Sequence, residues 1–304
     1  MIGRAATQQS SDLRHQRVEH PTASASRVVM VRVWRVALYA VLIGMSVVFL
    51  IPLFWLITTS LKTQGDVFAY PPVWIPDPLR WSNYAEAAER APLGQWLKNT
   101  SIVTGLAVLG NVLTSSLVAF GFARLRFPGR GFLFILLLST MMLPEVVLLV
   151  PQFILFRELG WVDTLLPLIV PSFFGGGAFN IFLVRQFYLT IPRDFDEAAR
   201  LDGASNWQIW RQIVLPLSTP VLIAVAIFSF VSHWNDFMGP LIYLQSEDLK
   251  TLALGLRAFI SPVDASWNVS MAAAMFLLVP VLVVFFVGQR YFIRGVAMTG
   301  IAGR

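Results

Sequence analysis

The sequence contains no cysteine among its 304 residues. A disulfide-stapled scaffold, a thiolate metal site and a cysteine nucleophile are therefore excluded. Charged residues are also scarce, at 13% of the chain, whereas a soluble domain has about 25%. So few charges cannot cover the surface of a water-soluble protein. Together with 56% hydrophobic residues and a mean hydropathy of +0.67, this scarcity indicates a membrane protein.

Lysine and histidine are rare as well. The three lysines, Lys62, Lys98 and Lys250, each follow a leucine, so the chain lacks a Gly-Lys-Ser/Thr phosphate-binding loop for hydrolysing ATP. Two of the three histidines, His15 and His20, belong to a polar N-terminal segment, and no metal site is expected. The net charge of +6 does not indicate nucleic-acid binding, because the basic residues lie between apolar stretches.

The sequence does have long apolar stretches. A helix rises about 1.5 Å per residue, so about 20 apolar residues cross the roughly 30 Å of hydrocarbon in a bilayer. Six such stretches follow one another, and Glu145, in the third, is their single charged residue. They predict an all-α polytopic membrane protein with six transmembrane helices, over residues 36–57, 99–123, 131–156, 164–184, 212–235 and 265–289.

The basic residues predict the orientation of these helices. With a cytoplasmic N-terminus, sixteen lysines and arginines lie inside and seven outside. Because positively charged loops favour the cytoplasmic side, both termini are expected in the cytoplasm. Residues 1–30 are polar and lack apolar periodicity, which predicts a disordered cytoplasmic tail. Residues 31–296 would form the transmembrane domain, and residues 297–304 a C-terminal cytoplasmic tail.

One cytoplasmic connection, at about 188–216, shows strong local signals. Asp194 and Glu197 form a capping pair that predicts a helix beginning near Phe195. Gly203, after an aspartate, predicts the end of that helix, because glycine readily takes a left-handed conformation. A short helix followed by a tight turn is therefore expected.

A second capping pair, Ser205 and Gln208, predicts another short helix after the turn. Ordering a helix–turn–helix costs chain entropy, and nothing inside a membrane bundle requires one. We therefore interpret the segment as a docking element for a cytoplasmic partner. The alternative is a helix pair lying on the lipid headgroups, which suits equally well the predicted apolar face of Trp207, Trp210 and Val214, ending at Pro216.

The same connection resembles the EAA loop in permease subunits of bacterial ABC importers. It matches that signature at every defined position, including the extension found in sugar importers: Glu197-Ala198-Ala199, Asp202-Gly203-Ala204, Ile213 and Leu215-Pro216. Eight or so positions at fixed spacing make a specific signal. Roughly residues 35–300 resemble the smaller permease subunit of maltose-type carbohydrate importers. The further matches are Asn83-Tyr84, Ala123 to Gly129, Met141 to Pro144, Trp234-Asn235-Asp236 and Gln289 to Phe292.

This resemblance implies a type I permease fold in the bacterial cytoplasmic (inner) membrane. The chain would form half of the translocation pathway of an importer for a sugar, either a di- or oligosaccharide or a related polyol. Its implied partners are a second permease in a heterodimer, an ATPase dimer and an extracytoplasmic solute-binding protein. The chain itself would be non-catalytic and bind no cofactor, because ATP and Mg²⁺ belong to the ATPase.

In that family the EAA loop forms a coupling helix seated in a cleft of the ATPase. Closure of the ATPase dimer would push the coupling helices together and switch the bundle between inward-open and outward-open states. The resemblance thus implies an ATPase-coupling site at Glu197, Ala198, Ala199, Arg200, Leu201, Asp202, Gly203 and Ala204.

Polar residues in or beside the apolar spans give a second candidate site. Because such residues are costly to bury, Glu145, Asn235 and Asp236 are expected near a sugar path, with Trp234 stacking on a sugar ring. The alternatives are that Asp236 is hydrated at the membrane surface and that Asn235 bonds another helix.

A self-sufficient carrier driven by an ion gradient is the alternative function. The EAA-like loop argues against it, as does the scarcity of titratable groups in and beside the spans, which offer only Glu145, Asp236 and His233. A membrane-embedded enzyme is a third class, but the sequence lacks a candidate catalytic cluster for one.

Overall fold

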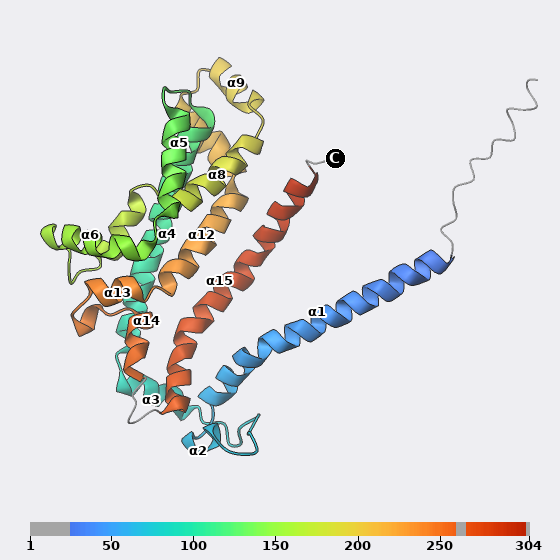
Figure 1. The fold of residues 1–304 in the computed structure, drawn as a ribbon, viewed down its shortest axis with the longest axis vertical. Coiled ribbons are helices and arrows are strands. Elements are labelled where there is room, and N and C mark those ends of the chain that lie inside the picture. Colours follow the sequence, from blue (N-terminus) through green and yellow to red (C-terminus); the bar gives the residue numbers. More distant parts are fainter. Residues whose placement is uncertain (1–24, 260–265, 302–304) are drawn as a thin grey trace, which may run out of the picture. The chain divides into compact units, whose positions relative to one another are not determined.

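The computed structural model describes residues 25–259 and 266–301. The chain divides into two compact units, one up to Trp55 and one from Leu56 onward, which we describe separately. Within the described ranges every regular element is a helix, as Figure 1 shows. The predicted all-α class is confirmed.

Helix α1 (Ala25–Ser60) contains the first predicted span. From Arg32 to Ser60 it is long and apolar enough to cross a membrane, and Pro52 lies inside it without ending it. The helix begins at Ala25, so it takes in the last residues of the predicted N-terminal tail. Residues 1–24 of that tail lie outside the described ranges.

Helix α4 (Leu93–Arg124) is the central helix of the second unit. Ser115, Ala119 and Ala123 lie one helical turn apart on it and are fully or almost fully buried. Small side chains let neighbouring helix backbones approach closely. The helices that pack against α4 here are α8 (Ala178–Thr190) and α12 (Thr219–Trp234).

Three glycines interrupt the fourth predicted span, which consists of α7 (Leu166–Ile169), η3 (Val170–Phe173) and then α8. Gly176 has a φ of +65° and packs directly against α4. A Cβ atom at this position would lie 2.7 Å from the carbonyl oxygen of Asn111 and 2.8 Å from the backbone nitrogen of Ser115. Both the left-handed backbone and the close approach therefore require glycine.

The third predicted span is not one continuous helix, so the prediction is wrong in this respect. It consists of α5 (Arg130–Ser139) with η2 (Thr140–Met142), followed by α6 (Glu145–Glu158) after a bend of 103°. Pro144 explains the break, because a proline ring disfavours helical geometry in the residue before it. Leu143 is accordingly extended, with ψ at 120°.

The fifth predicted span is divided as well. Residues 206–217 form one helix, which bends by 79° into α12 at Ser218. The prediction that this first helix ends at Pro216 is wrong, because the helix continues to Leu217. A π-helical turn directly before Pro216 changes the backbone spacing at the point where the proline ring would otherwise clash. The three segments of this helix are α10 (Asn206–Ile209), η4 (Trp210–Val214) and α11 (Leu215–Leu217).

The sixth predicted span lies in α15 (Trp267–Ile301), which is apolar enough to cross a membrane from Trp267 to Gln289. It runs through most of the predicted C-terminal tail, whose residues 302–304 lie outside the described ranges. In all, the described residues contain four helices long and apolar enough to cross a membrane, or six if each bent pair counts as one span.

The two ends of α4 carry different connections. Helix α9 (Asp194–Leu201) lies at its C-terminal end, and short helices lie around its N-terminal end (Figure 1). Trp96 of α4 is buried among these short helices. The short helices packed around Trp96 are α3 (Ser82–Arg90), α14 (Leu252–Gly255) and η6 (Leu256–Phe259), whereas α2 (Gln64–Val67) contacts α15.

The contact at Gly176 gives a first prediction. Gly176→Ala should destabilise the folded protein by about 1–3 kcal/mol, because the added methyl group overpacks the contact with α4. Gly105→Ala is the control. Gly105 lies in α4 itself, and a Cβ atom added there would meet nothing within 4 Å. Unfolding by SDS in mixed micelles measures both variants, and equal stability of the two would contradict the packing argument.

Candidate functional site

Helix α9 begins one residue earlier than predicted, at Asp194. Arg193, directly before it, already has helical angles, with φ at −74° and ψ at −17°. Asp194 therefore lies inside the first turn and does not cap the helix, so the predicted capping pair with Glu197 is wrong. The negative charge of Asp194, with those of Asp196 and Glu197, still stabilises the N-terminal end of α9 through the helix dipole.

The turn and the second helix form as predicted. Gly203 has a φ of +82°, in the left-handed region. Ser205 Oγ accepts a hydrogen bond from the backbone nitrogen of Gln208 at 3.3 Å, and Gln208 Oε1 accepts one from the backbone nitrogen of Ser205 at 2.7 Å. The residues of the predicted apolar face differ in burial, since Trp210 is buried whereas Trp207 is 55% exposed.

Most of the predicted coupling residues lie at the surface. Leu201 is 90% exposed, although it is a large apolar residue. Ala199 instead packs into the core formed with α4, α8 and α12, and Ala204 is half-buried against the same core. The other exposed members of the predicted set are Glu197, Ala198, Arg200, Asp202 and Gly203.

A buried ion pair fixes α9 to α4. Arg124, the last residue of α4, lies 3.4 Å from Asp196 between Nη1 and Oδ2, and the two side chains are 2% and 6% exposed. Arg124 Nη2 also donates a hydrogen bond of 2.9 Å to the carbonyl oxygen of Ile191. Removing one partner of such a pair is costly, because it leaves the other charge buried and uncompensated.

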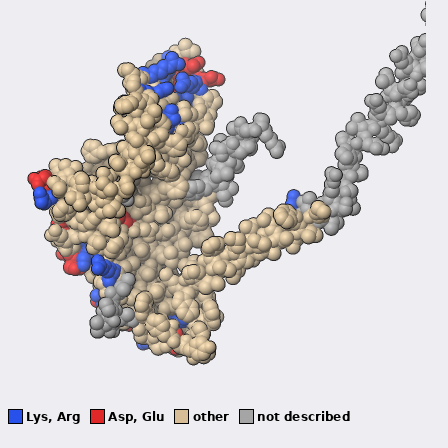
Figure 2. Space-filling model, viewed as in Figure 1, with Lys and Arg blue, Asp and Glu red and all other residues tan. Residues whose placement is uncertain are grey.

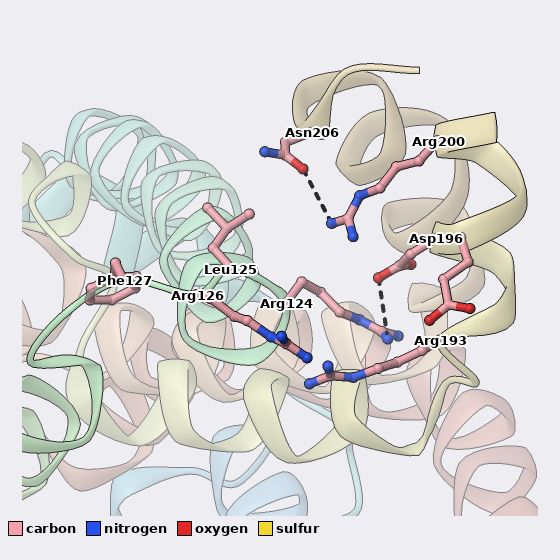
Figure 3. A pocket seen from close by; sticks show the side chains of 9 residues that line it. Arg124, Leu125, Arg126, Phe127, Arg193, Asp196, Arg200 and Asn206 are labelled. Carbon is pink, nitrogen blue, oxygen red and sulfur yellow. Dashed lines mark hydrogen bonds and ion pairs between the residues drawn. The ribbon is translucent and has the colours of Figure 1, made fainter. Parts of the chain in front are cut away.

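A cavity of about 570 Å³ opens beside this ion pair (Figure 3). It lies between α9 and the turn that joins α4 to α5. Figure 2 shows Lys and Arg gathered at this end of the second unit, above a largely uncharged surface. The cavity is lined by Arg124, Leu125, Arg126, Phe127, Arg193, Asp196, Glu197, Arg200 and Asn206.

A second cavity, of about 470 Å³, lies where α6, α7 and η3 meet the end of α12 and the following helix α13 (Met238–Tyr243). Its polar lining includes Ser172, His233 and Gln152. Ser172 Oγ and His233 Nε2 are 3.3 Å apart, and His233 Nδ1 is 2.8 Å from the carbonyl oxygen of Ser229. The cavity thus offers a hydroxyl, an imidazole and an amide.

The structure brings one of the predicted path residues into this cavity. Asp236 lines it and accepts a hydrogen bond of 3.1 Å from the backbone nitrogen of Gly239. Burial raises the pKa of Asp236 above its ordinary value, against the opposing effects of backbone hydrogen bonds and the nearby His233.

Trp234 and Asn235, two of the other predicted path residues, do not line this cavity. Trp234 is buried, and its Nε1 donates a hydrogen bond of 2.8 Å to the carbonyl oxygen of Leu277 in α15. Asn235 is exposed and bonds the carbonyl oxygen of Val231 in its own helix rather than another helix. Glu145 begins α6, but its side chain lies outside the described part of the structure.

Residues 111–298, which carry α9 and both cavities, match the family described as the inner membrane component of binding-protein-dependent transport systems. The chain belongs to this family. It is a non-catalytic, multi-pass permease subunit of an ABC importer in the inner membrane. The ion-gradient-driven carrier receives no support from the comparisons.

Two relatives and one solved structure illustrate the family. The chain is 32% identical to the probable ABC transporter permease protein YurM of Bacillus subtilis, over 83% of each chain. It is 32% identical to the maltose/maltodextrin permease MalG of Salmonella typhimurium, over 83% of this chain and 90% of MalG. A bacterial ABC transporter that imports alginate has a subunit of the same fold, with a TM-score of 0.77 and 24% identity over 86% of this chain and 97% of that subunit.

The buried pair gives a second prediction. Asp196→Ala should destabilise the permease by about 3–5 kcal/mol, because Arg124 would lose its counter-charge in a buried site. Asp194→Ala, an exposed change in the same helix, should cost less than about 1 kcal/mol. SDS unfolding measures both, and the double variant Arg124→Met/Asp196→Leu should recover much of the loss. Equal stability of the two single variants would contradict the assignment.

Proposed function

We propose that α9 and the turn after it dock this permease onto a cytoplasmic ATPase subunit. The observation that carries the proposal is the two-sided character of α9. Asp196 and Ala199 hold the helix to the bundle, whereas Leu201 projects almost fully exposed beside the left-handed Gly203. A short helix fixed on one side with an exposed leucine on the other suits a protein cleft.

The headgroup alternative fits this surface less well. A helix that lies on a membrane needs a continuous apolar face. On α9 the exposed apolar residues are Phe195, Ala198 and Leu201, and the charged side chains of Asp194 and Asp202 lie between them on the same side of the helix. Alternation of apolar and charged groups is typical of a protein interface with a polar rim.

The proposal takes the α9 end as cytoplasmic. Arginines from two connections that are both predicted to be cytoplasmic support this orientation. Arg124 and Arg126 follow the second span, Arg193 and Arg200 follow the fourth, and all four line one cavity. The structure therefore gathers at one end the charges that the positive-inside rule assigns to one side.

The geometry offers a route for mechanical coupling. A push on α9 would reach α4 through the Arg124–Asp196 pair. Helix α4 has 32 residues, which corresponds to a length of about 48 Å. At its other end, Asn99 Nδ2 donates to the carbonyl oxygens of Asp248 and Lys250 at 2.8 and 2.9 Å. A displacement of α4 as a rigid body would therefore also move the connection after α13.

We further propose that the chain forms one half of a path for a di- or oligosaccharide or a related polyol, beside a different permease subunit. The carbohydrates named for MalG and for the alginate transporter support this substrate class. So do the hydroxyl, imidazole and carboxyl groups in the cavity at Asp236, because such groups hydrogen-bond sugar hydroxyls. Resemblance to the smaller subunit of maltose-type importers supports a heterodimer.

The docking proposal predicts the effect of one glycine substitution. Gly203→Asp should lower ATP-dependent uptake at least about tenfold and uncouple ATP hydrolysis from transport, while the permease still inserts. Gly129→Asp is a matched control, because both glycines have left-handed angles, with φ at +82° and +74°, and open space around the Cβ position. Unchanged uptake in Gly203→Asp, or equal loss in both variants, would defeat the docking assignment.

A transport assay separates the importer from the carrier. Uptake into vesicles that contain the assembled complex should require ATP and the solute-binding protein, and should persist when an uncoupler removes the proton gradient. Uptake that continues without the ATPase subunit and stops with the uncoupler would instead show a carrier. Pull-down of untagged by tagged copies of this chain would contradict the heterodimer, whereas pull-down of the second permease alone is expected.

A further inference from the structure

The cavity beside the buried ion pair has more positive than negative charge. Four arginines and two carboxylates line it. Figure 3 shows the guanidinium ends of Arg126 and Arg193 pointing toward one another, close to Arg124. Crowded like charges repel, and an anion between them would remove that repulsion.

The contacts of these arginines leave room for such an anion. Asp196 compensates Arg124, and Arg200 contacts Asn206 Oδ1 at 3.5 Å. The ion pairs among the described residues include none for Arg126 or Arg193. Arg124 is also nine-tenths buried, and its Nε finds no hydrogen-bond acceptor within the described part of the chain.

The cavity lies on a different face of α9 from the exposed Ala198, although Glu197 and Arg200 belong both to the cavity and to the edge of the docking surface. Arg193, Asp196, Glu197 and Arg200 line the cavity and are spaced i, i+3, i+4 and i+7, so they share one side of the helix. Ala198 lies on the opposite side. An ATPase subunit could therefore seat on that side while the cavity keeps a ligand of its own.

The surroundings of the cavity indicate where the anion comes from. The cavity lies where the apolar helix α4 ends and just before α5 begins. Because the end of a membrane-spanning helix lies near the bilayer surface, we expect the cavity at the level of the lipid headgroups. Leu125 and Phe127 add apolar lining. Helix α5 continues with the exposed apolar residues Phe132, Ile135 and Leu136, along which acyl chains could lie.

We infer that this cavity binds the phosphate group of an anionic phospholipid of the cytoplasmic leaflet, between Arg126 and Arg193. Guanidinium groups bind phosphate oxygens in a bidentate geometry, and basic pockets between transmembrane helices on the cytoplasmic side suit lipid headgroups. The bound lipid would brace α9 from the side that faces the membrane. The inference rests on the proposed function only for the cytoplasmic orientation of α9.

Lipid retention tests the inference separately from ATPase docking. The purified complex is placed in nanodiscs that contain increasing fractions of phosphatidylglycerol in phosphatidylcholine, and the retained lipid is counted by native mass spectrometry. Arg193→Gln and Arg126→Gln should each weaken phosphatidylglycerol retention about tenfold, the usual loss for a hydrogen bond to a charged group. Arg211→Gln, an exposed arginine of the same connection outside the cavity, should retain the lipid as the wild type does.

Three results would overturn the inference. Equal retention in Arg193→Gln and Arg211→Gln would show that the cavity does not select the lipid. Thermal stabilisation of the complex by inorganic phosphate, without any by phosphatidylglycerol, would identify a free anion as the ligand. Loss of the ATPase from Arg193→Gln with unchanged lipid retention would show that an acidic side chain of a partner occupies the cavity. In the wild-type complex, by contrast, failure of α9 to contact the ATPase together with normal lipid retention would contradict only the proposed function.

Discussion

The contact between Arg124 and Asp196 joins α9 to the central helix α4, the two parts that would have to move together in the proposed coupling. One charge ends the central helix, the other lies in α9, and both are almost completely buried. A buried charge without a partner is costly in free energy. The pair therefore holds α9 to the bundle in two ways: the two charges attract each other, and separating them would leave each one buried and uncompensated. Because the carbonyl oxygen of Ile191 also binds Arg124, the chain leading into α9 is fixed at the same point.

Close packing around α4 would allow this connection to pass a displacement of α9 on to the rest of the bundle. A fixed α9 would transmit little if the central helix could slide past its neighbours. Small residues on α4 and the glycine at 176 bring backbones so close that an added Cβ would overlap α4. Such interdigitated contacts shift between discrete arrangements rather than deforming gradually. The same compactness would let a sub-ångström change at the ion pair reach the far end of the bundle.

Local chemistry in the sequence predicted the middle of the loop, but neither the capping pair at Asp194 nor a helix end at Pro216. The glycine turn at 203 and the capping box at 205–208 follow from neighbouring residues, and both are present. Helix continuity was harder to predict, since an apolar stretch looks much the same whether it is straight or bent at Pro144 or Ser218. The Arg124–Asp196 pair was not foreseen, because its partners are separated by two spans and each resembles an ordinary surface charge.

In the proposed coupling, the corner at Ser218 would let the helix that follows the docking turn act as a lever. Helix α10 to α11 meets α12 there at 79°, and the far end of α12 leads directly to the cavity at Asp236. Its 16 residues correspond to an arm of about 24 Å, so a tilt of about 10° at the corner would swing the cavity end by about 4 Å. That distance approaches the width of a sugar ring. A modest rotation at Ser218 would therefore be enough to open or close the cavity at Asp236 without any helix changing its length.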